Sequence, residues 1–139
     1  MNPNDLIRRA EEAARHARSP YSGVRVGTAA VDREGRVWTG CNIENASYGM
    51  TLCAERVALF KGLSEGAFCF DGIAIWSDTG FLLFPCGACL QVLVEWMPGD
   101  AKIWIAGPGH EKEEHLLREL LPHSLQNLRD HLRQEDAGD

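Results

Sequence analysis

Two short apolar segments with a helical pattern between them place the strongest limit on what this chain can fold into. Residues 73–76 and 102–106 are mostly apolar runs, which is typical of strands buried on both faces of a sheet. Residues 87–97 have a helical pattern that ends at Pro98-Gly99. The strand, helix, strand order predicts two strands of one sheet with a helix packed on its face.

The preceding segments add a hairpin and a helix to this sheet. Residues 24–31 and 36–41 are rich in Val, Thr and Trp and are separated by Asp-Arg-Glu-Gly, which predicts two antiparallel strands. Residues 53–63 have a helical pattern that is closed by glycines. The order of all these elements predicts an α/β fold, in which helices cover the faces of a mixed sheet.

The two ends of the chain are less regular. A first helix is expected to begin at a cap formed by Asn4 or Asp5 and to end at Ser19-Pro20. The polar residues 107–115 leave open whether one more strand follows. A last amphipathic helix is predicted from three leucines, Leu125, Leu128 and Leu132.

Length and composition narrow the class of protein. The 139 residues suit one domain, which we expect over residues 1–133, with a polar tail over residues 134–139. A net charge of −6 without any basic run argues against a nucleic-acid partner. No apolar run reaches the roughly 18–20 residues of a membrane span. The charged N-terminus does not resemble a signal peptide, so a cytoplasmic location with reduced thiols is expected.

Three of the five cysteines stand where a metal ion could bind. Cys86 and Cys89 form a C-x-x-C pair, and both this pair and Cys53 fall at predicted helix starts. The partial positive charge and free N–H groups of a helix N-terminus favour a thiolate over a thiol. Two helix starts directed at one point would therefore form a metal site. Cys41 and Cys69 are expected to be plain, partly buried thiols, although either one as a fourth ligand would make the metal structural.

Glu55, in the first turn after Cys53, has two interpretations. An isolated glutamate there would complement the helix dipole. Beside a zinc ion with three cysteine ligands it would be a proton shuttle, because three protein ligands leave the fourth position open, as in catalytic zinc sites. Three thiolates make such a centre negative, which hinders ionisation of its water, so Arg56 and the helix ends are candidates to withdraw charge.

These motifs resemble the signature of the small zinc-dependent cytidine deaminases with three cysteine ligands. The resemblance rests on residues 53–55 (Cys-Ala-Glu), residues 85–89 (Pro-Cys-Gly-Ala-Cys) and residues 42–45 (Asn-Ile-Glu-Asn), and it extends over nearly the whole chain. It implies a three-layer α/β/α fold with a five-stranded mixed sheet. It also implies assembly as a homotetramer with shared active sites.

The same resemblance implies a role for each motif residue at the metal. The zinc ligands would be Cys53, Cys86 and Cys89. Glu55 would transfer protons, and Arg56 would hydrogen-bond to the cysteine sulfurs. This set predicts hydrolytic deamination with Zn²⁺ as the cofactor.

Further positions would contact the nucleoside. Asn42 and Glu44 would bind the ribose 3′-hydroxyl, and the Ala54 amide would bind the base carbonyl. Ala46 and Tyr48 would reach the ribose 5′ end of a substrate in a neighbouring subunit. The family has aromatic residues near the base at two positions that are aliphatic here, Val24 and Leu125.

The predicted function is deamination of free cytidine or 2′-deoxycytidine to the uridine form in pyrimidine salvage. The aliphatic residues near the base predict a broadened tolerance for base-modified cytidines. One alternative is a deaminase of another aminopyrimidine nucleoside, such as a nucleoside antibiotic. A second alternative, from a different class, is a non-catalytic structural zinc module.

Overall fold

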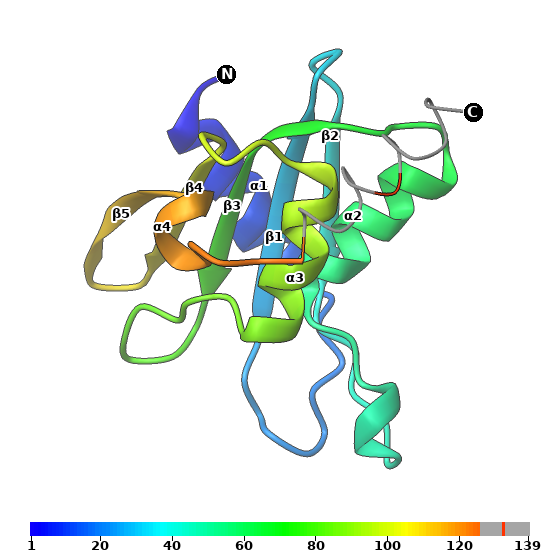
Figure 1. The fold of residues 1–139 in the computed structure, drawn as a ribbon. Helices are drawn as coiled ribbons and strands as arrows, with labels where there is room; N and C mark the ends of the chain where they lie inside the picture. Colours follow the sequence, from blue (N-terminus) through cyan, green and yellow to red (C-terminus); the bar gives the residue numbers. More distant parts are fainter. Residues whose placement is uncertain (126–131, 133–139) are drawn as a thin grey trace.

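The structure is a computed structural model that describes residues 1–125 and residue 132. Its centre is a sheet in which the strands follow the order β2-β1-β3-β4-β5 (Figure 1). The strands are β1 (Val26–Asp32), β2 (Val37–Cys41), β3 (Phe70–Ser77), β4 (Lys102–Gly107) and β5 (His110–Leu116). Only the β3–β4 pair among these strands is parallel, so the predicted five-stranded mixed sheet is confirmed.

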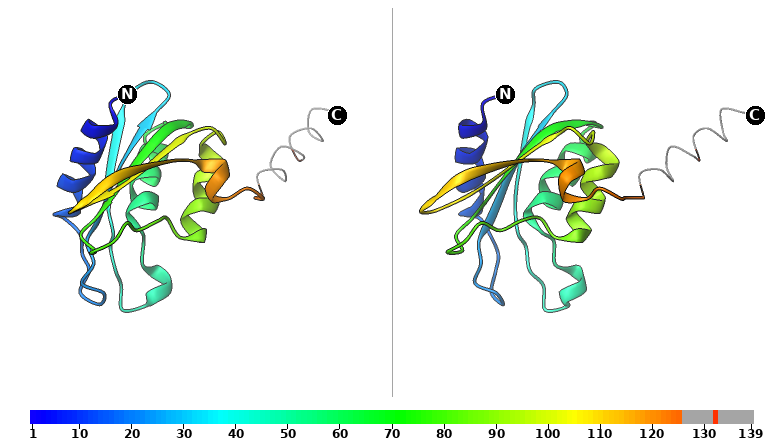
Figure 2. Two further views of the ribbon diagram at one scale, coloured as in Figure 1. Left: turned by 90° about the vertical axis from the view of Figure 1, so that its left-hand side faces the viewer. Right: turned by 60° about the vertical axis from the view of Figure 1, so that its left-hand side comes forward.

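Helices cover both faces of the sheet and give the predicted three layers (Figure 2). The helices are α1 (Pro3–Ala14), α2 (Ala54–Ser64), α3 (Gly87–Trp96), α4 (Leu117–Leu120) and the short 3-10 helix η1 (Tyr48–Met50). α1 packs on one face against β1 and β3, and α2 and α3 lie on the opposite face (Figure 1). None of the described helices is long and apolar enough to cross a bilayer.

The first helix begins earlier than the sequence pattern predicts. Its cap is Asn2, whose side chain accepts hydrogen bonds from the backbone N–H groups of Asn4 and Asp5. Pro3 occupies the first helical position, where its fixed φ favours a helix start and its missing N–H costs nothing. The prediction of Asn4 or Asp5 as the cap was therefore wrong by two or three residues.

The same helix also ends earlier, at Ala14 instead of the Ser19-Pro20 step. The backbone N–H of Arg18 donates to the carbonyl oxygen of Asn42, at 2.9 Å, in the segment after β2. Arg18 also pairs with Ile43 in an isolated parallel bridge. Arg18 is therefore held outside the helix by a long-range contact with the segment after β2, which no local pattern encodes.

Residues 107–115, which the sequence left open, contain most of β5. This strand pairs with β4 after a tight turn in which Gly109 has φ of +74°. Glu114 accepts hydrogen bonds from Trp104 Nε1 at 2.8 Å and from Lys102 Nζ at 3.1 Å. β5 is an edge strand with exposed charges, so it lacks the apolar alternation of a half-buried strand. The predicted last helix and the tail over residues 134–139 fall almost wholly outside the described residues.

The turn of the β1–β2 hairpin is built around the buried carboxylate of Asp32, which is 3% exposed. One oxygen accepts from the backbone N–H groups of Glu34 and Arg36, and the other accepts from Arg36 Nε and Trp38 Nε1. Burial by itself raises the pKa of Asp32, but the hydrogen bonds from Trp38 and Arg36 outweigh it and lower the pKa below its usual value. The hairpin therefore depends on an ionised Asp32.

Gly40 on β2 allows α2 to lie directly on the sheet. A Cβ atom at this position would lie 2.6 Å from the backbone nitrogen of Ala58 and 2.7 Å from the carbonyl oxygen of Ala54. A larger residue would force the backbone of α2 away, because real Cβ atoms do not approach other atoms this closely. Gly40 therefore sets how deep the N-terminus of α2 sits.

Candidate active site and metal centre

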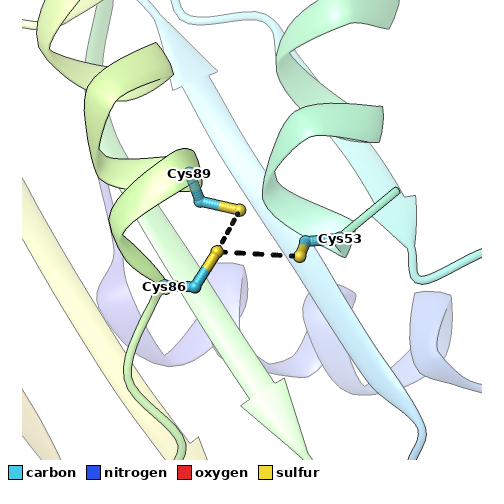
Figure 3. Close-up of side chains that lie close together, drawn as sticks. All are labelled: Cys53, Cys86 and Cys89. Atoms are coloured by element: carbon cyan, nitrogen blue, oxygen red, sulfur yellow. Dashed lines mark hydrogen bonds between the residues drawn. The ribbon is translucent and has the colours of Figure 1, made fainter. Parts of the chain in front are cut away.

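Three cysteines meet where the N-termini of α2 and α3 converge (Figure 3). Cys53 is the N-cap of α2, Cys86 is the N-cap of α3, and Cys89 lies in the first turn of α3. The Sγ atoms lie within 4.8 Å of one another, with 4.0 Å between Cys53 and Cys86 and 3.5 Å between Cys86 and Cys89. The tertiary structure thus assembles the predicted ligand set.

The spacing of these sulfurs fits a zinc ion. Tetrahedral ligands at a Zn–S distance of about 2.3 Å are separated by about 3.8 Å, and the Cys53–Cys86 and Cys86–Cys89 separations of 4.0 Å and 3.5 Å bracket that value. Three thiolates are also the soft ligands that zinc accepts readily. Among the described residues, neither Cys41 nor Cys69 joins the cluster, so a closed fourth cysteine ligand is not present there.

The thiol of Cys53 has a lowered pKa within this cluster. A hydrogen bond from Cys89 lowers the pKa of Cys53, burial opposes this effect, and the nearby guanidinium of Arg56 lowers it further, to about 5. Arg56 Nη2 donates to Cys53 Sγ at 3.5 Å. Arg56 Nε is buried and has no hydrogen-bond partner among the described residues, so the guanidinium keeps a free donor at an anionic site. Arg56 therefore lies where it can offset thiolate charge.

Glu55 is buried at 4% exposure beside this cluster. Burial raises the pKa of Glu55 to about 7, and the charge of Cys53 acts in the same direction. Its Oε1 lies 3.5 Å from the hydroxyl of Thr28 on β1, at the limit of a hydrogen bond. Hydrogen bonding to Cys53, burial and the neighbouring Glu55 raise the pKa of Cys89. A carboxyl in these surroundings can exchange a proton near neutral pH.

A cavity of about 240 Å³ adjoins the cluster. Cys53, Cys86 and Glu55 line it together with Asn42 and Glu44, and most of its remaining wall is apolar. A concave, largely apolar space with a few converging polar groups is the usual form of a small-molecule site. The cavity thus connects the metal ligands to the Asn-Ile-Glu-Asn element.

Hydrogen bonds within the fold orient Asn42 and Glu44 at this cavity. The amide of Asn42 accepts from Val26 N at 2.9 Å and donates to Val24 O at 2.8 Å, which leaves one N–H free to donate to a ligand. Glu44 accepts from the backbone N–H groups of Tyr21 and Ser22 and from the Ser22 hydroxyl. The Ser22 contacts lower the pKa of Glu44, so it is an oriented carboxylate with remaining acceptor capacity.

The other predicted site residues divide into two groups. Ala54, at the first position of α2, and Val24 both line the cavity. A single chain does not bring Ala46, Tyr48 or Leu125 to this cavity; Tyr48 is 74% exposed and Leu125 is 63% exposed. Tyr48 instead lines an adjoining cavity that shares Glu44 with the first.

Sequence reasoning missed several of the residues that line the cavity. Leu83 and Phe84, in the segment between β3 and α3, form part of the cavity wall. The run of apolar residues at positions 81–84, directly before Pro85, was the available signal. Ser22 lines the cavity and also orients Glu44, but only its contacts in the folded chain reveal that role.

Comparisons with known proteins agree with this geometry. The family model described as the cytidine and deoxycytidylate deaminase zinc-binding region matches residues 1–105. The cytidine deaminase of Halalkalibacterium halodurans is 45% identical over 122 residues, covering 88% of this chain and 92% of the relative. The cytidine deaminase of Mycobacterium tuberculosis is 42% identical over 119 residues, covering 86% of each.

Solved structures show the same fold. The crystal structure of cytidine deaminase from Burkholderia pseudomallei superposes with a TM-score of 0.85 at 38% identity, covering 89% of this chain and 99% of that chain. The structure of the enzyme from Mycobacterium tuberculosis gives a TM-score of 0.77 at 40% identity, over 89% of this chain and 97% of that chain. With the cysteine cluster and the family match, these likenesses show that the chain belongs to the zinc-binding cytidine and deoxycytidylate deaminase family.

Proposed function

We propose that this chain catalyses the zinc-dependent hydrolytic deamination of free cytidine and 2′-deoxycytidine to uridine and 2′-deoxyuridine, a reaction of pyrimidine salvage. The observation that carries this proposal is one cavity lined by two of the three clustered cysteines, the buried Glu55 and the oriented pair Asn42 and Glu44. Such a site has a metal, a proton carrier and hydroxyl-binding groups within one small space. The requirement for reduced thiols suits a cytoplasmic location.

Cys53, Cys86 and Cys89 would hold the metal, and Arg56 would moderate their charge. Zinc, when bound there, supplies a water of lowered pKa and polarises the reacting centre. Glu55 takes one proton from the attacking water and delivers it to N3 of the pyrimidine while oxygen adds to C4. Glu55 then transfers the second proton to the amino group, the C4–N bond breaks, and ammonia leaves.

The remaining polar groups would orient the nucleoside. Glu44 is held by Ser22 and Tyr21 and would accept a hydrogen bond from a ribose hydroxyl. Asn42 would donate its free N–H to the ribose. Ala54 would donate its backbone N–H to the base carbonyl, because the first N–H groups of a helix have no intrahelical acceptor. These contacts would aim C4 of the base at the metal ligands.

The cavity constrains the identity of the base less than it constrains the ribose. Val24 lines the cavity as a small aliphatic residue, which supports tolerance of cytidines that carry extra groups on the ring or on the exocyclic nitrogen. The small aliphatic side chain of Val24 in the cavity wall also favours the second candidate, a deaminase of another aminopyrimidine nucleoside. Parallel assays of cytidine, 2′-deoxycytidine and substituted cytidines, followed by ultraviolet absorbance, rank these substrates.

The catalytic role of Glu55 is tested by Glu55→Gln. Loss of a positioned proton carrier costs roughly 10²–10⁴-fold in rate, whereas all three cysteines remain, so we expect kcat for cytidine to fall in this range with zinc content unchanged. Glu65→Gln, at the exposed C-terminal end of the same helix, is the matched control and should keep full activity. Near-normal turnover by Glu55→Gln would overturn the assignment, and a zinc-loaded wild type without deaminase activity would favour the structural zinc module.

The assembly belongs to the same proposal. We expect a homotetramer in which Ala46, Tyr48 and Leu125 reach the active site of a neighbour. The high exposure of Tyr48 and Leu125 in a single chain supports this, because large apolar side chains left in water are often covered by a partner.

A further inference from the structure

We infer that Phe84 packs its aromatic ring against the pyrimidine of the substrate and that His115 on β5 holds this ring in place. Phe84 would thus be a specificity-determining contact, and His115 a positioning residue that acts through it. The inference rests on the proposed function, because it concerns the base of the proposed nucleoside.

Phe84 lies two positions before a metal ligand. It lines the cavity that Cys86 and Glu55 also line, and it is the one aromatic residue among the described residues of that wall. The other apolar side chains that form the wall, such as Val24 and Ile75, are aliphatic. A flat heteroaromatic ring gains more from an aromatic neighbour than from an aliphatic one. A base whose C4 lies near the metal ligands would therefore meet its aromatic partner at Phe84.

The exposure of Phe84 also indicates that its ring can gain burial when a ligand binds. The residue is 43% exposed although it borders a cavity. A partly exposed phenyl ring gains further burial only when something apolar fills the adjoining space. A pyrimidine in the cavity would supply this cover without any movement of the core.

His115 gives the ring a fixed support. The rings of Phe84 and His115 meet edge to face, with centroids 5.2 Å apart and an interplanar angle of 64°. His115 is opposite Ile103 in the β4–β5 ladder, and its Nε2 lies 2.9 Å from Glu113 Oε2. Phe84 itself lies in a segment without helix or strand. The contact with His115 on the sheet therefore positions the Phe84 ring, which its own irregular segment would leave free to rotate.

Pro85 restricts the backbone between the Phe84 ring and the metal ligand Cys86. It stands between Phe84 and Cys86, and proline fixes φ near −65°. Few rotatable backbone bonds therefore separate the aromatic ring from the ligand. A base that contacts Phe84 would therefore lie close to the metal ligands, which links recognition of the base to placement of the reacting carbon.

The test compares Phe84→Leu with Phe81→Leu in the zinc-loaded protein. Leucine keeps much of the apolar volume of Phe84 but removes the ring, so we expect KM for cytidine to rise about 10-fold with kcat changed less than about twofold. The Kd for uridine, the inert product, should rise by the same factor in calorimetry. Phe84→Tyr keeps the ring and should restore both values. Phe81→Leu should match the wild type, because Phe81 is 58% exposed and does not line the cavity.

The role of His115 is tested by a double-mutant comparison. His115→Ala should raise KM by a few-fold and should add nothing to Phe84→Leu, because it acts only through that ring. Additive effects would overturn the positioning role. If Phe84→Leu matches Phe81→Leu in both KM and Kd, the aromatic contact is wrong although the enzyme is active. If the zinc-loaded wild type does not deaminate cytidine, the proposed function fails and this inference fails with it.

Discussion

Gly40→Ala should weaken both the fold and the active site, because the same contact supports the two. The new Cβ would lie 2.6 Å from Ala58 N in α2. To restore an ordinary contact of 3.4 Å, α2 must retreat by roughly 0.8 Å, and overpacking of this kind costs about 1–3 kcal/mol of unfolding free energy. α2 carries Cys53 at its cap and Glu55 in its first turn, and a displacement near 1 Å at a reacting group can cost about 100-fold in rate.

Two measurements on purified protein check this prediction. Thermal unfolding should show a midpoint lowered by roughly 4–12 °C for this chain size, and kcat/KM for cytidine should fall by about 10–100-fold. Gly80→Ala is the matched control, because its Cβ has nothing within 4 Å. A Gly40→Ala protein that equals Gly80→Ala in both stability and activity would refute the argument that this glycine sets the depth of α2.

Two further predictions concern the hairpin and the assembly. Asp32→Asn should lower the unfolding free energy at pH 7 by about 1–3 kcal/mol. Because the folded pKa of Asp32 is depressed, this contribution is complete above the unfolded pKa of about 3.9 and is lost as pH falls through the folded value. Urea unfolding at pH 7 and pH 3 measures the difference in unfolding free energy between the wild type and Asp32→Asn. A difference that does not shrink at pH 3 contradicts the role of the carboxylate. Light scattering should give four times the chain mass of 15.4 kDa for the active enzyme, and an active monomer would contradict the proposed sharing of Tyr48 and Leu125 between subunits.

Local sequence patterns were sufficient for most elements of this fold. The hairpin, the buried strands β3 and β4 and the helices α2 and α3 follow from apolar periodicity and from glycine and proline punctuation, which act over a few residues. Edge strand β5 escaped this reasoning. Its exposed charges are stabilised by pairing with β4 and by contacts such as that between Glu114 and Trp104, which a local pattern does not contain.

The chemistry of the site was also readable from the sequence, because helix starts create local fields. Cys53, Glu55, Cys86 and Cys89 each sit at or near a helix N-terminus, where free N–H groups and the helix dipole favour anions. The residue types and their placement therefore predict, from the sequence alone, a metal site of three cysteines with an adjacent carboxyl.

Only the tertiary structure decided how these groups meet. Cys53 and Cys86 are 33 positions apart in the chain, and packing of α2 and α3 on one face of the sheet brings their sulfurs to 4.0 Å. The burial of Glu55, the hydrogen bonds from Ser22 to Glu44 and the ring contact between Phe84 and His115 arise in the same way. Local propensity acts over one or two turns of chain, whereas burial, pKa and cavity shape depend on neighbours that only the packed sheet and helices supply.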